Sequence, residues 1–204
     1  LFLLSDSGIH LRARMMIVLA KEGWQEKMAA KRVVMVVDMQ NGVFATPRVE
    51  RERCAAQINR LINAADTVIF IQHCEAGGLE EGSEGFALLP ELIQPAGSLY
   101  VTKTACDAFY RTRLEEVLRE HHITQFVICG CATDYCVDTT IKNGASRGYA
   151  ITVAEDAHTT ANRPAAPAVT LIAHYNDVWR SLTVPGNPLQ VKPTETILSG
   201  WQAN

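Results

Sequence analysis

The chain contains 204 residues, of which 48% are apolar and 20% charged, and its 19 basic against 22 acidic side chains leave a formal net charge of −3. This balance provides no basic excess to neutralise a phosphate backbone, so we expect no nucleic-acid partner. No apolar run reaches the roughly 20 residues that a membrane-spanning helix requires, so we expect no membrane partner either. The composition is typical of a globular protein, and a chain of this length can bury a sizeable core in one domain.

The first 27 residues differ from the rest of the chain, because the stretch from Met28 onward is typical of a protein N-terminus. The apolar patch at 15–20 follows two arginines, as in a signal peptide, but it is short and no cleavage site of small residues follows it. We interpret residues 1–27 as an N-terminal extension or a start-site artefact, and we expect a single domain over residues 28–204.

Six cysteines are spread irregularly along the chain, at positions 54, 74, 106, 129, 131 and 136. They are too sparse for a disulfide scaffold in a chain of this length, which favours a reducing compartment. We therefore expect a cytoplasmic protein in which one of the thiols is a candidate for reactivity.

Compact apolar runs alternate with amphipathic segments from Lys31 onward, which is typical of repeated βα units on a parallel sheet. The first run, Val33–Val37, is unbroken and predicts a central strand covered on both faces. The later segments predict, in chain order, a helix over 50–65, a strand over 67–72, a loop over 73–97 with one helical turn near 88–93, a strand over 99–102, a helix over about 110–121, a strand over 125–130, a helix over 134–147, a strand over 150–154, a helix starting near Pro164 and Pro167, and a sixth strand within 177–193. Together they predict a three-layer α/β/α fold around a doubly wound, six-stranded parallel sheet.

Polar side chains stand at the expected carboxyl ends of the strands, where open α/β sheets gather their reactive groups. Asp38 follows the first strand and His73 the second. Lys103 follows the third, and the turn after the fourth leads to Cys136. A carboxylate, an ammonium and a thiol can form a nucleophile with its acid-base partner and a charge-setting cation.

Three of these side chains also have a structural interpretation. Cys136 lies in the first turn of the predicted helix, where N–H groups and the helix dipole favour a thiolate, although a helix cysteine is more often a small buried apolar residue. A carboxylate after five buried residues is costly to desolvate, so Asp38 indicates function, with a capping or turn role as the alternative. Lys103 taken alone would be an ordinary surface lysine.

Three segments carry a resemblance to a known family: VVMVVDMQNGVF (Val33 to Phe44), VTKTACDAFYRTRLEEVL (101–118) and FVICGCATDYCVDTTIKNGASRGYAITVAEDA (126–157). Together they resemble the isochorismatase-like cysteine hydrolases, a superfamily that includes nicotinamidases and N-carbamoylsarcosine amidohydrolases. The similarity covers about residues 31–198, and three motifs in the same order are far more specific than one. The family's fold, a parallel six-stranded sheet flanked by helices, agrees with the fold predicted from the alternating segments.

The resemblance implies a catalytic triad of Asp38, Lys103 and Cys136. It further implies a cis peptide between Cys131 and Ala132, and an oxyanion hole made by the backbone N–H groups of Ala132 and Cys136. The implied reaction is hydrolysis of a C–N bond, in an amide, ureido or carbamoyl group of a small molecule, through a thioester intermediate. Isochorismatases of the siderophore pathway lack the cysteine, so vinyl-ether hydrolysis is disfavoured.

Metal-dependent nicotinamidases carry an Asp-x-His motif and further histidines after the second strand, whereas this chain has only His73 there. We therefore expect an enzyme that uses no metal and no cofactor. Two alternatives are a nicotinamidase proper and a member of the fold that binds a small molecule without turning it over. Members of this family commonly form dimers or larger assemblies, so the resemblance also implies a homo-oligomer.

Six side chains near the motifs are candidates for the substrate pocket: Phe44, His73, Phe86, Phe109, Tyr135 and His174. Packing in the core is an equal alternative for each aromatic ring, and a hydrogen-bonded core position is the alternative for each histidine. Cys131 is expected beside the site without being the nucleophile. The remaining cysteines are interpreted as packing or incidental residues, at positions 54, 74, 106 and 129.

Overall fold

The unbroken apolar run Val33–Val37 forms the strand β1, and all five of its residues are buried. Its odd-numbered side chains join one core cluster and its even-numbered side chains the other, because successive residues of a strand point to opposite faces of the sheet. The structure is a computed structural model that describes residues 31–203, so the extension predicted over residues 1–27 lies outside the described residues.

The helices and strands alternate along the chain. Their bounds are β1 Val33–Val37, η2 Val43–Ala45, α2 Arg51–Ala64, β2 Thr67–His73, β3 Leu99–Lys103, α3 Leu114–Glu120, β4 Gln125–Cys131, η3 Thr133–Val137, α4 Asp138–Ser146, β5 Ala150–Thr159, α5 Ala168–Ser181, β6 Gln190–Lys192 and α6 Thr194–Gln202.

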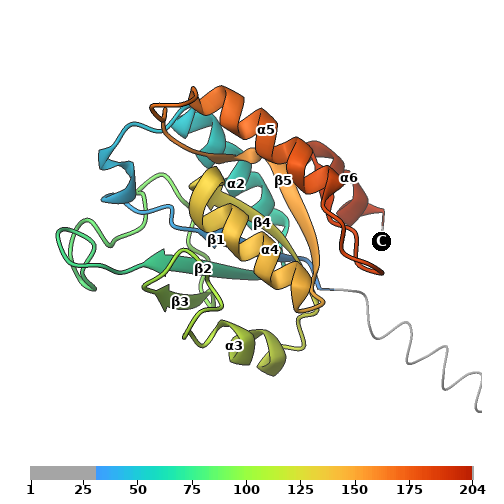
Figure 1. Ribbon diagram of the computed structural model, residues 1–204. Coiled ribbons are helices and arrows are strands. Elements are labelled where there is room, and N and C mark those ends of the chain that lie inside the picture. The colour runs from blue at the N-terminus through green and yellow to red at the C-terminus, as the bar shows by residue number, and fades with distance from the viewer. Residues whose placement is uncertain (1–30, 204) are drawn as a thin grey trace, which may run out of the picture. The chain divides into compact units, whose positions relative to one another are not determined.

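All six strands pair in parallel, in the order β3-β2-β1-β4-β5-β6 (Figure 1). Helices α2 and α6 contribute to the core on one face of the sheet, and helices α3, α4 and α5 to the core on the other. The predicted three-layer, doubly wound fold is therefore confirmed. The strand order reverses between β1 and β4, and the crevice at such a point is where doubly wound sheets place their ligands.

Two predicted helices begin differently in the structure. Helix α3 starts at Leu114, not near residue 110, because the Thr112 hydroxyl donates to the Ala108 carbonyl and accepts from the Leu114 N–H, which holds this segment in turns. The helix predicted over 134–147 begins as the single π-helical turn η3 and continues as α4.

Three other segments also differ from the prediction. The residues near 88–93 form turns without a helix. Strand β5 continues to Thr159, beyond the predicted end at residue 154, because a register shift beside Gly130 lets its second half pair again with β4. Helix α6 was not predicted, and the sixth strand before it is only three residues long.

Within residues 31–203, no helix combines the length and the apolar character that crossing a membrane would demand.

Gly130 allows β4 to approach the last residue of β1, Val37. Its φ is +117°, and a Cβ atom there would lie 2.2 Å from the carbonyl oxygen of Val37. Gly130→Ala should therefore lower the free energy of unfolding by about 3 kcal/mol or more, because strained backbone and overpacking add up. Gly148→Ala is the matched control, since its φ of +92° is also positive but nothing lies within 4 Å of the added Cβ. Urea denaturation of the two variants tests this, and equal stability would contradict it.

Candidate active site

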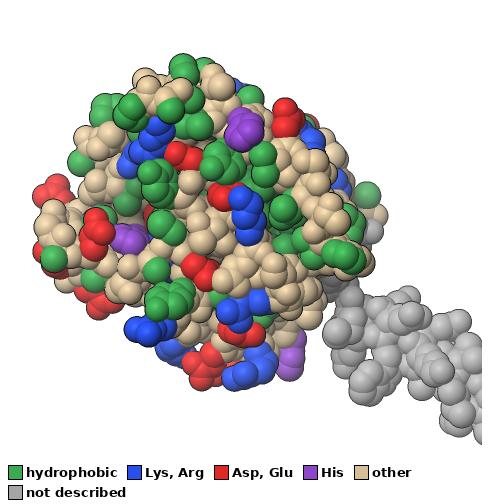
Figure 2. All heavy atoms as spheres, viewed as in Figure 1, with side chains coloured by type: hydrophobic (Ala, Val, Ile, Leu, Met, Phe, Trp, Pro, Cys, Tyr) green, Lys and Arg blue, Asp and Glu red, His purple; other side chains and the backbone are tan. Residues whose placement is uncertain are grey.

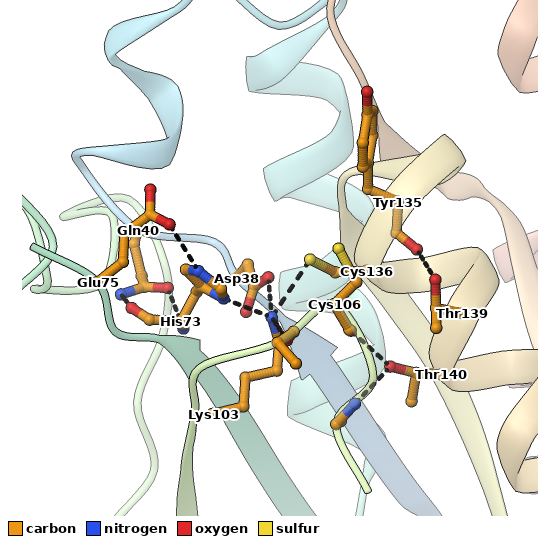
Figure 3. A network of polar contacts seen from close by, with 12 residues as sticks. Asp38, Gln40, His73, Glu75, Lys103, Cys106, Tyr135, Cys136, Thr139 and Thr140 are labelled. Carbon is orange, nitrogen blue, oxygen red and sulfur yellow. Dashed lines mark hydrogen bonds and ion pairs between the residues drawn. The ribbon is translucent and has the colours of Figure 1, made fainter. Parts of the chain in front are cut away.

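Four side chains from the ends of four strands meet at one edge of the sheet (Figure 3). Asp38 directly follows β1, and His73 and Lys103 are the last residues of β2 and β3. Cys136 lies in η3, the turn that follows β4. Because neighbouring parallel strands end at the same edge of the sheet, residues far apart in sequence become direct neighbours here.

The ammonium group of Lys103 is the centre of this cluster. Its Nζ lies 2.7 Å from Asp38 Oδ2 and 3.2 Å from Cys136 Sγ. It also lies 3.0 Å from His73 Nδ1 and 3.1 Å from the Ala105 carbonyl oxygen. Lys103 is only 1% exposed, so these contacts replace its hydration. An ammonium has three N–H donors for these four acceptors. It can therefore exchange one acceptor for another and still make three hydrogen bonds.

Asp38 has a strained backbone and a partly unused carboxylate. Its φ is +47°, in the left-handed region that few residues other than glycine adopt, and the residue is 2% exposed. One carboxylate oxygen binds Lys103. The other, Oδ1, is the one buried side-chain oxygen or nitrogen without a hydrogen-bond partner among the described residues. Strain and an orphaned buried acceptor both indicate a functional position, because each destabilises the fold.

The thiol of Cys136 is protonated in the free site. Burial raises its pKa, and so does the negative charge of Asp38, while the positive charge of Lys103 acts in the opposite direction. Desolvation therefore outweighs the N–H groups and the helix dipole, which favour a thiolate. A thiol in this state could act as a nucleophile only with a base that removes its proton.

Lys103 keeps its positive charge in the same environment. Burial alone would lower its pKa, but the charge of Asp38 and the hydrogen bonds to Asp38 and Cys136 raise it by more, and the net result lies above the ordinary value. The site thus holds an ammonium, a carboxylate and a neutral thiol in direct contact.

The turn that carries Cys136 begins at a cis peptide bond between Cys131 and Ala132, at the position that the resemblance implies. The Ala132 carbonyl accepts hydrogen bonds from the N–H groups of Tyr135 (3.0 Å) and Val137 (3.2 Å). The five-residue spacing of the second bond produces the π-helical turn. Cys136 thus lies at the start of a helix, as the sequence predicts.

Of the six predicted pocket residues, His73 lies in the cluster and Phe86 lies beside it. The His73 side chain is 15% exposed, and its Nε2 lies 3.2 Å from Glu75 at the rim. The backbone carbonyl of Phe86 accepts hydrogen bonds from Gln40 and Gln72, both at 3.0 Å, and its ring is half-buried.

The other four are placed elsewhere. Phe109 packs in the core against Tyr149, and Phe44 is 7% exposed in the opposite core, so the packing alternative holds for both. Tyr135 is exposed under the guanidinium of Arg163 and points away from Lys103 and Cys136 in Figure 3. His174 is exposed on α5, where its ring contacts Tyr175.

Gln40 is a buried site residue that the sequence analysis did not single out. Its side chain is fully buried and accepts from the His73 N–H (2.7 Å) while donating to the His73 carbonyl (3.0 Å). This clamp fixes the end of β2 and hence the imidazole that contacts Lys103. The available signal was an amide residue three positions after a buried strand, where its side chain needs buried partners.

His158 is a second such residue, buried near the end of β5 with 4% exposure. Its Nδ1 lies 2.8 Å from Thr133 Oγ1, and its Nε2 lies 3.0 Å from Asn176 Oδ1. Burial lowers its pKa to about 4, although hydrogen bonding to Asn176 and the charge of Asp156 act in the opposite direction. The imidazole is therefore neutral at physiological pH.

The depressed pKa of His158 predicts a pH-dependent stability. Between pH 4 and 6.5 the unfolded chain binds a proton that the folded chain does not, so the free energy of unfolding should fall by about 3 kcal/mol as pH decreases through this window. Denaturant titrations of the wild type and of His158→Leu at several pH values measure the effect. The variant should show a flatter dependence, since other groups titrate equally in both proteins, and equal slopes would contradict the prediction.

The cluster also contains three possible metal ligands. Asp38, His73 and Cys136 each offer one ligand atom, and these atoms lie within 4.8 Å of one another. However, the Lys103 ammonium contacts all three side chains. A metal ion bound among the same donors would have to displace that ammonium or lie next to a like charge, so the donor set fits a metal poorly.

Comparisons with known proteins agree with the fold and the motifs. The Isochorismatase domain matches residues 32–175 of the chain. YddQ, an isochorismatase family protein of Bacillus subtilis, is 23% identical over 176 residues, which cover 81% of this chain and 97% of YddQ. RutB, a ureidoacrylate amidohydrolase of Yersinia enterocolitica, is 34% identical over 79 residues, which cover only 39% of this chain and 34% of RutB.

A solved structure agrees in the same way. The crystal structure of N-carbamoylsarcosine amidase from Thermoplasma acidophilum has a TM-score of 0.65 at 24% identity, covering 81% of this chain and 98% of that one, which is a likeness of fold. Since the Isochorismatase domain matches well over half of the chain, the protein belongs to the isochorismatase family.

Proposed function

We propose that the protein is a cysteine-dependent hydrolase that cleaves a C–N bond of a small molecule through a thioester on Cys136. The contact of one buried ammonium with both Asp38 (2.7 Å) and Cys136 (3.2 Å) carries this proposal. An ion pair that only stabilises the fold needs no thiol beside it. A cysteine nucleophile, in contrast, needs a base and a cation close to its sulfur.

The first half of the reaction is acylation. Asp38 takes the thiol proton as the sulfur of Cys136 attacks the substrate carbonyl, so an S–C bond forms and the carbonyl oxygen becomes negative. The N–H groups of Ala132 and Cys136 stabilise this oxyanion, a contribution of about 3 kcal/mol per donor in other enzymes. Asp38 then gives its proton to the nitrogen of the leaving group, the C–N bond breaks and the amine departs.

The second half is hydrolysis of the thioester. Asp38 takes a proton from water as the water oxygen attacks the thioester carbonyl. The C–S bond breaks, the sulfur regains the proton from Asp38 and the acid product leaves. Lys103 remains protonated throughout and stabilises each negative charge next to it, and its pKa is raised in the free site.

A nitrogen leaving group suits this site, because an amine departs only when it is protonated and Asp38 holds a proton at that stage. The relative RutB is an amidohydrolase by name, which supports the same class of bond. A nicotinamidase is the alternative within this class. Outside this class, the alternative is a protein that binds a small molecule without turnover. That alternative does not explain why the backbone of Asp38 is strained.

We further propose that the reaction needs neither a metal nor a cofactor, because Lys103 supplies the positive charge that a metal would otherwise provide.

Substrates without negative charge suit the surface around the site best. Acidic side chains gather over the loop between β2 and β3 in Figure 2, and the exposed ones in this loop are Glu75, Glu80, Glu81 and Glu84. All six cysteines are free, which fits a reducing compartment such as the cytoplasm.

An ammonia-release screen over amides, ureas and carbamoyl compounds tests this function. Nicotinamide belongs in the panel because it separates the nicotinamidase alternative from the others. We expect release of ammonia from at least one neutral compound by the wild type and none by Cys136→Ala. Selective alkylation of Cys136 that is lost in Asp38→Ala would support the same triad. Uniform slow labelling of all six cysteines, without turnover of any compound, would overturn the proposal in favour of the binding protein.

A further inference from the structure

His158 takes no part in the proposed chemistry, yet it is enclosed between the turn that carries Cys136 and helix α5. Its imidazole bridges Thr133 Oγ1 (2.8 Å) and Asn176 Oδ1 (3.0 Å). The ring also packs edge-on against Trp179 at a centroid distance of 5.1 Å. A buried polar bridge of this kind fixes the elements that it joins, because breaking it leaves unsatisfied groups in the interior.

The protons in this bridge can be assigned from its outer end. Asn176 Nδ2 donates to the Glu155 carbonyl at 3.2 Å, so the Asn176 oxygen faces His158 and must accept a hydrogen bond from the Nε2–H group. The neutral imidazole then has only a lone pair at Nδ1. The Thr133 hydroxyl therefore donates to it, and every polar atom of the bridge has a partner.

Thr133 is the residue through which this bridge acts on the site. It is fully buried and lies between Ala132 and Cys136, the two residues whose N–H groups face the oxyanion in the proposed reaction. The next residue, Asp134, is held separately by Arg163 at 2.8 Å. Two successive side chains thus fix the turn: Asp134 through Arg163, and Thr133 through its hydrogen bond to His158.

We propose that His158, oriented by Asn176, is a positioning residue that fixes the Ala132–Cys136 turn through the hydroxyl of Thr133. The inference rests on the proposed function, because the groups that it positions are the nucleophile and the oxyanion donors. A displacement of about 1 Å in such groups reduces rates by up to about 100-fold, so the loss should appear in oxyanion-forming chemistry.

Two reagents separate positioning from stability. p-Nitrophenyl acetate acylates a thiol through a tetrahedral oxyanion: an S–C bond forms and the bond to p-nitrophenolate breaks. Iodoacetamide alkylates the same sulfur by displacing iodide, with no oxyanion. The ratio of the two rate constants at Cys136 therefore reports the geometry of the turn, and a change in stability alone does not move it.

The wild-type full chain is compared with four variants of the bridge and with one control variant. Thr133→Val should lower the ratio about 10- to 100-fold, and Thr133→Ser should restore most of it. His158→Leu should match Thr133→Val, while His158→Asn, which keeps an acceptor for the hydroxyl, should retain more of the ratio.

Thr194→Val is the matched control. Thr194, the first residue of helix α6, is also fully buried, and its hydroxyl donates to Asp156 of strand β5 at 2.7 Å instead of to a residue of the bridge. Unfolding by urea should show similar losses of stability for Thr133→Val and Thr194→Val, with the ratio lowered only in the former.

The possible outcomes distinguish the two proposals. If Thr133→Val keeps the wild-type ratio, or if Thr194→Val lowers it equally, the positioning role is wrong while the nucleophile stands. If neither reagent modifies Cys136 selectively in the wild type, the proposed function fails and the positioning role fails with it.

Discussion

Cys136→Ala is expected to abolish turnover of any substrate found in the screen while the fold remains intact. The ion pair between Lys103 and Asp38, at 2.7 Å, does not involve the sulfur and should survive the substitution. Loss of the nucleophile from a catalytic triad lowers kcat by about 10⁴-fold or more. Ammonia release and urea denaturation of the same preparation measure both properties.

Cys106→Ala is the matched control for this prediction. Cys106 is a second free, half-buried thiol near Cys136 (Figure 3), and its carbonyl accepts a hydrogen bond from Thr140 at 3.5 Å. Removing its side chain leaves that carbonyl in place, so activity close to that of the wild type is expected. Similar turnover in the two variants would contradict the assignment of Cys136.

Lys103→Met is expected to have the largest effect on stability. The Lys103 side chain is fully buried and that of Asp38 is 3% exposed, so the substitution leaves a buried carboxylate without its counter-ion. Breaking such a pair by removing one partner costs about 3–5 kcal/mol, and the thiol also loses the cation that stabilises its negative form. Both the free energy of unfolding and kcat should fall, and urea denaturation with ammonia release measures them.

The double variant Asp38→Asn/Lys103→Met separates the loss of stability from the loss of activity. Without either charge, the desolvation penalty disappears and much of the lost stability should return, because replacing a whole buried pair is far less costly than breaking it. Activity should remain absent, since no base is left. Additive losses of stability in the double variant would show that the pair contributes no coupling, and turnover in it would exclude Asp38 as the base.

The sequence indicated that Asp38, Lys103 and Cys136 lie close together, because strand ends are easy to locate. The unbroken run Val33–Val37 needs cover on both faces, which makes it central and puts Asp38 at the edge where the crevice opens. The same reasoning located Lys103 at the end of β3, and the structure shows both in contact. Predicting the positions of Asp38 and Lys103 therefore required no knowledge of side-chain packing.

Properties that depend on packing were less accessible. The dipole at the start of the predicted helix favoured a thiolate at Cys136, but burial raises its pKa, and sequence does not give the degree of burial. Phe109 flanks a motif yet packs against Tyr149, because residues next to a site in sequence can face the core. His158 was not singled out, because its partners come from two distant segments.

The predicted boundaries of helices and strands were wrong where local contacts override the hydrophobic pattern. Thr112 holds the start of the predicted helix in turns, so α3 begins at Leu114. Strand β5 runs past polar residues to Thr159, because its pairing with β4 resumes after a register shift. Neither effect leaves a hydrophobic period in the sequence.

The most direct test of Cys136 as the nucleophile is mass spectrometry of the acid-quenched enzyme during turnover, with hydroxylamine as a trap. A thioester predicts a gain equal to the mass of the acyl group, located on the peptide that contains Cys136, and a hydroxamate product when hydroxylamine is present. Turnover with neither an adduct nor a hydroxamate, together with ammonia release by Cys136→Ala at the wild-type rate, would contradict it.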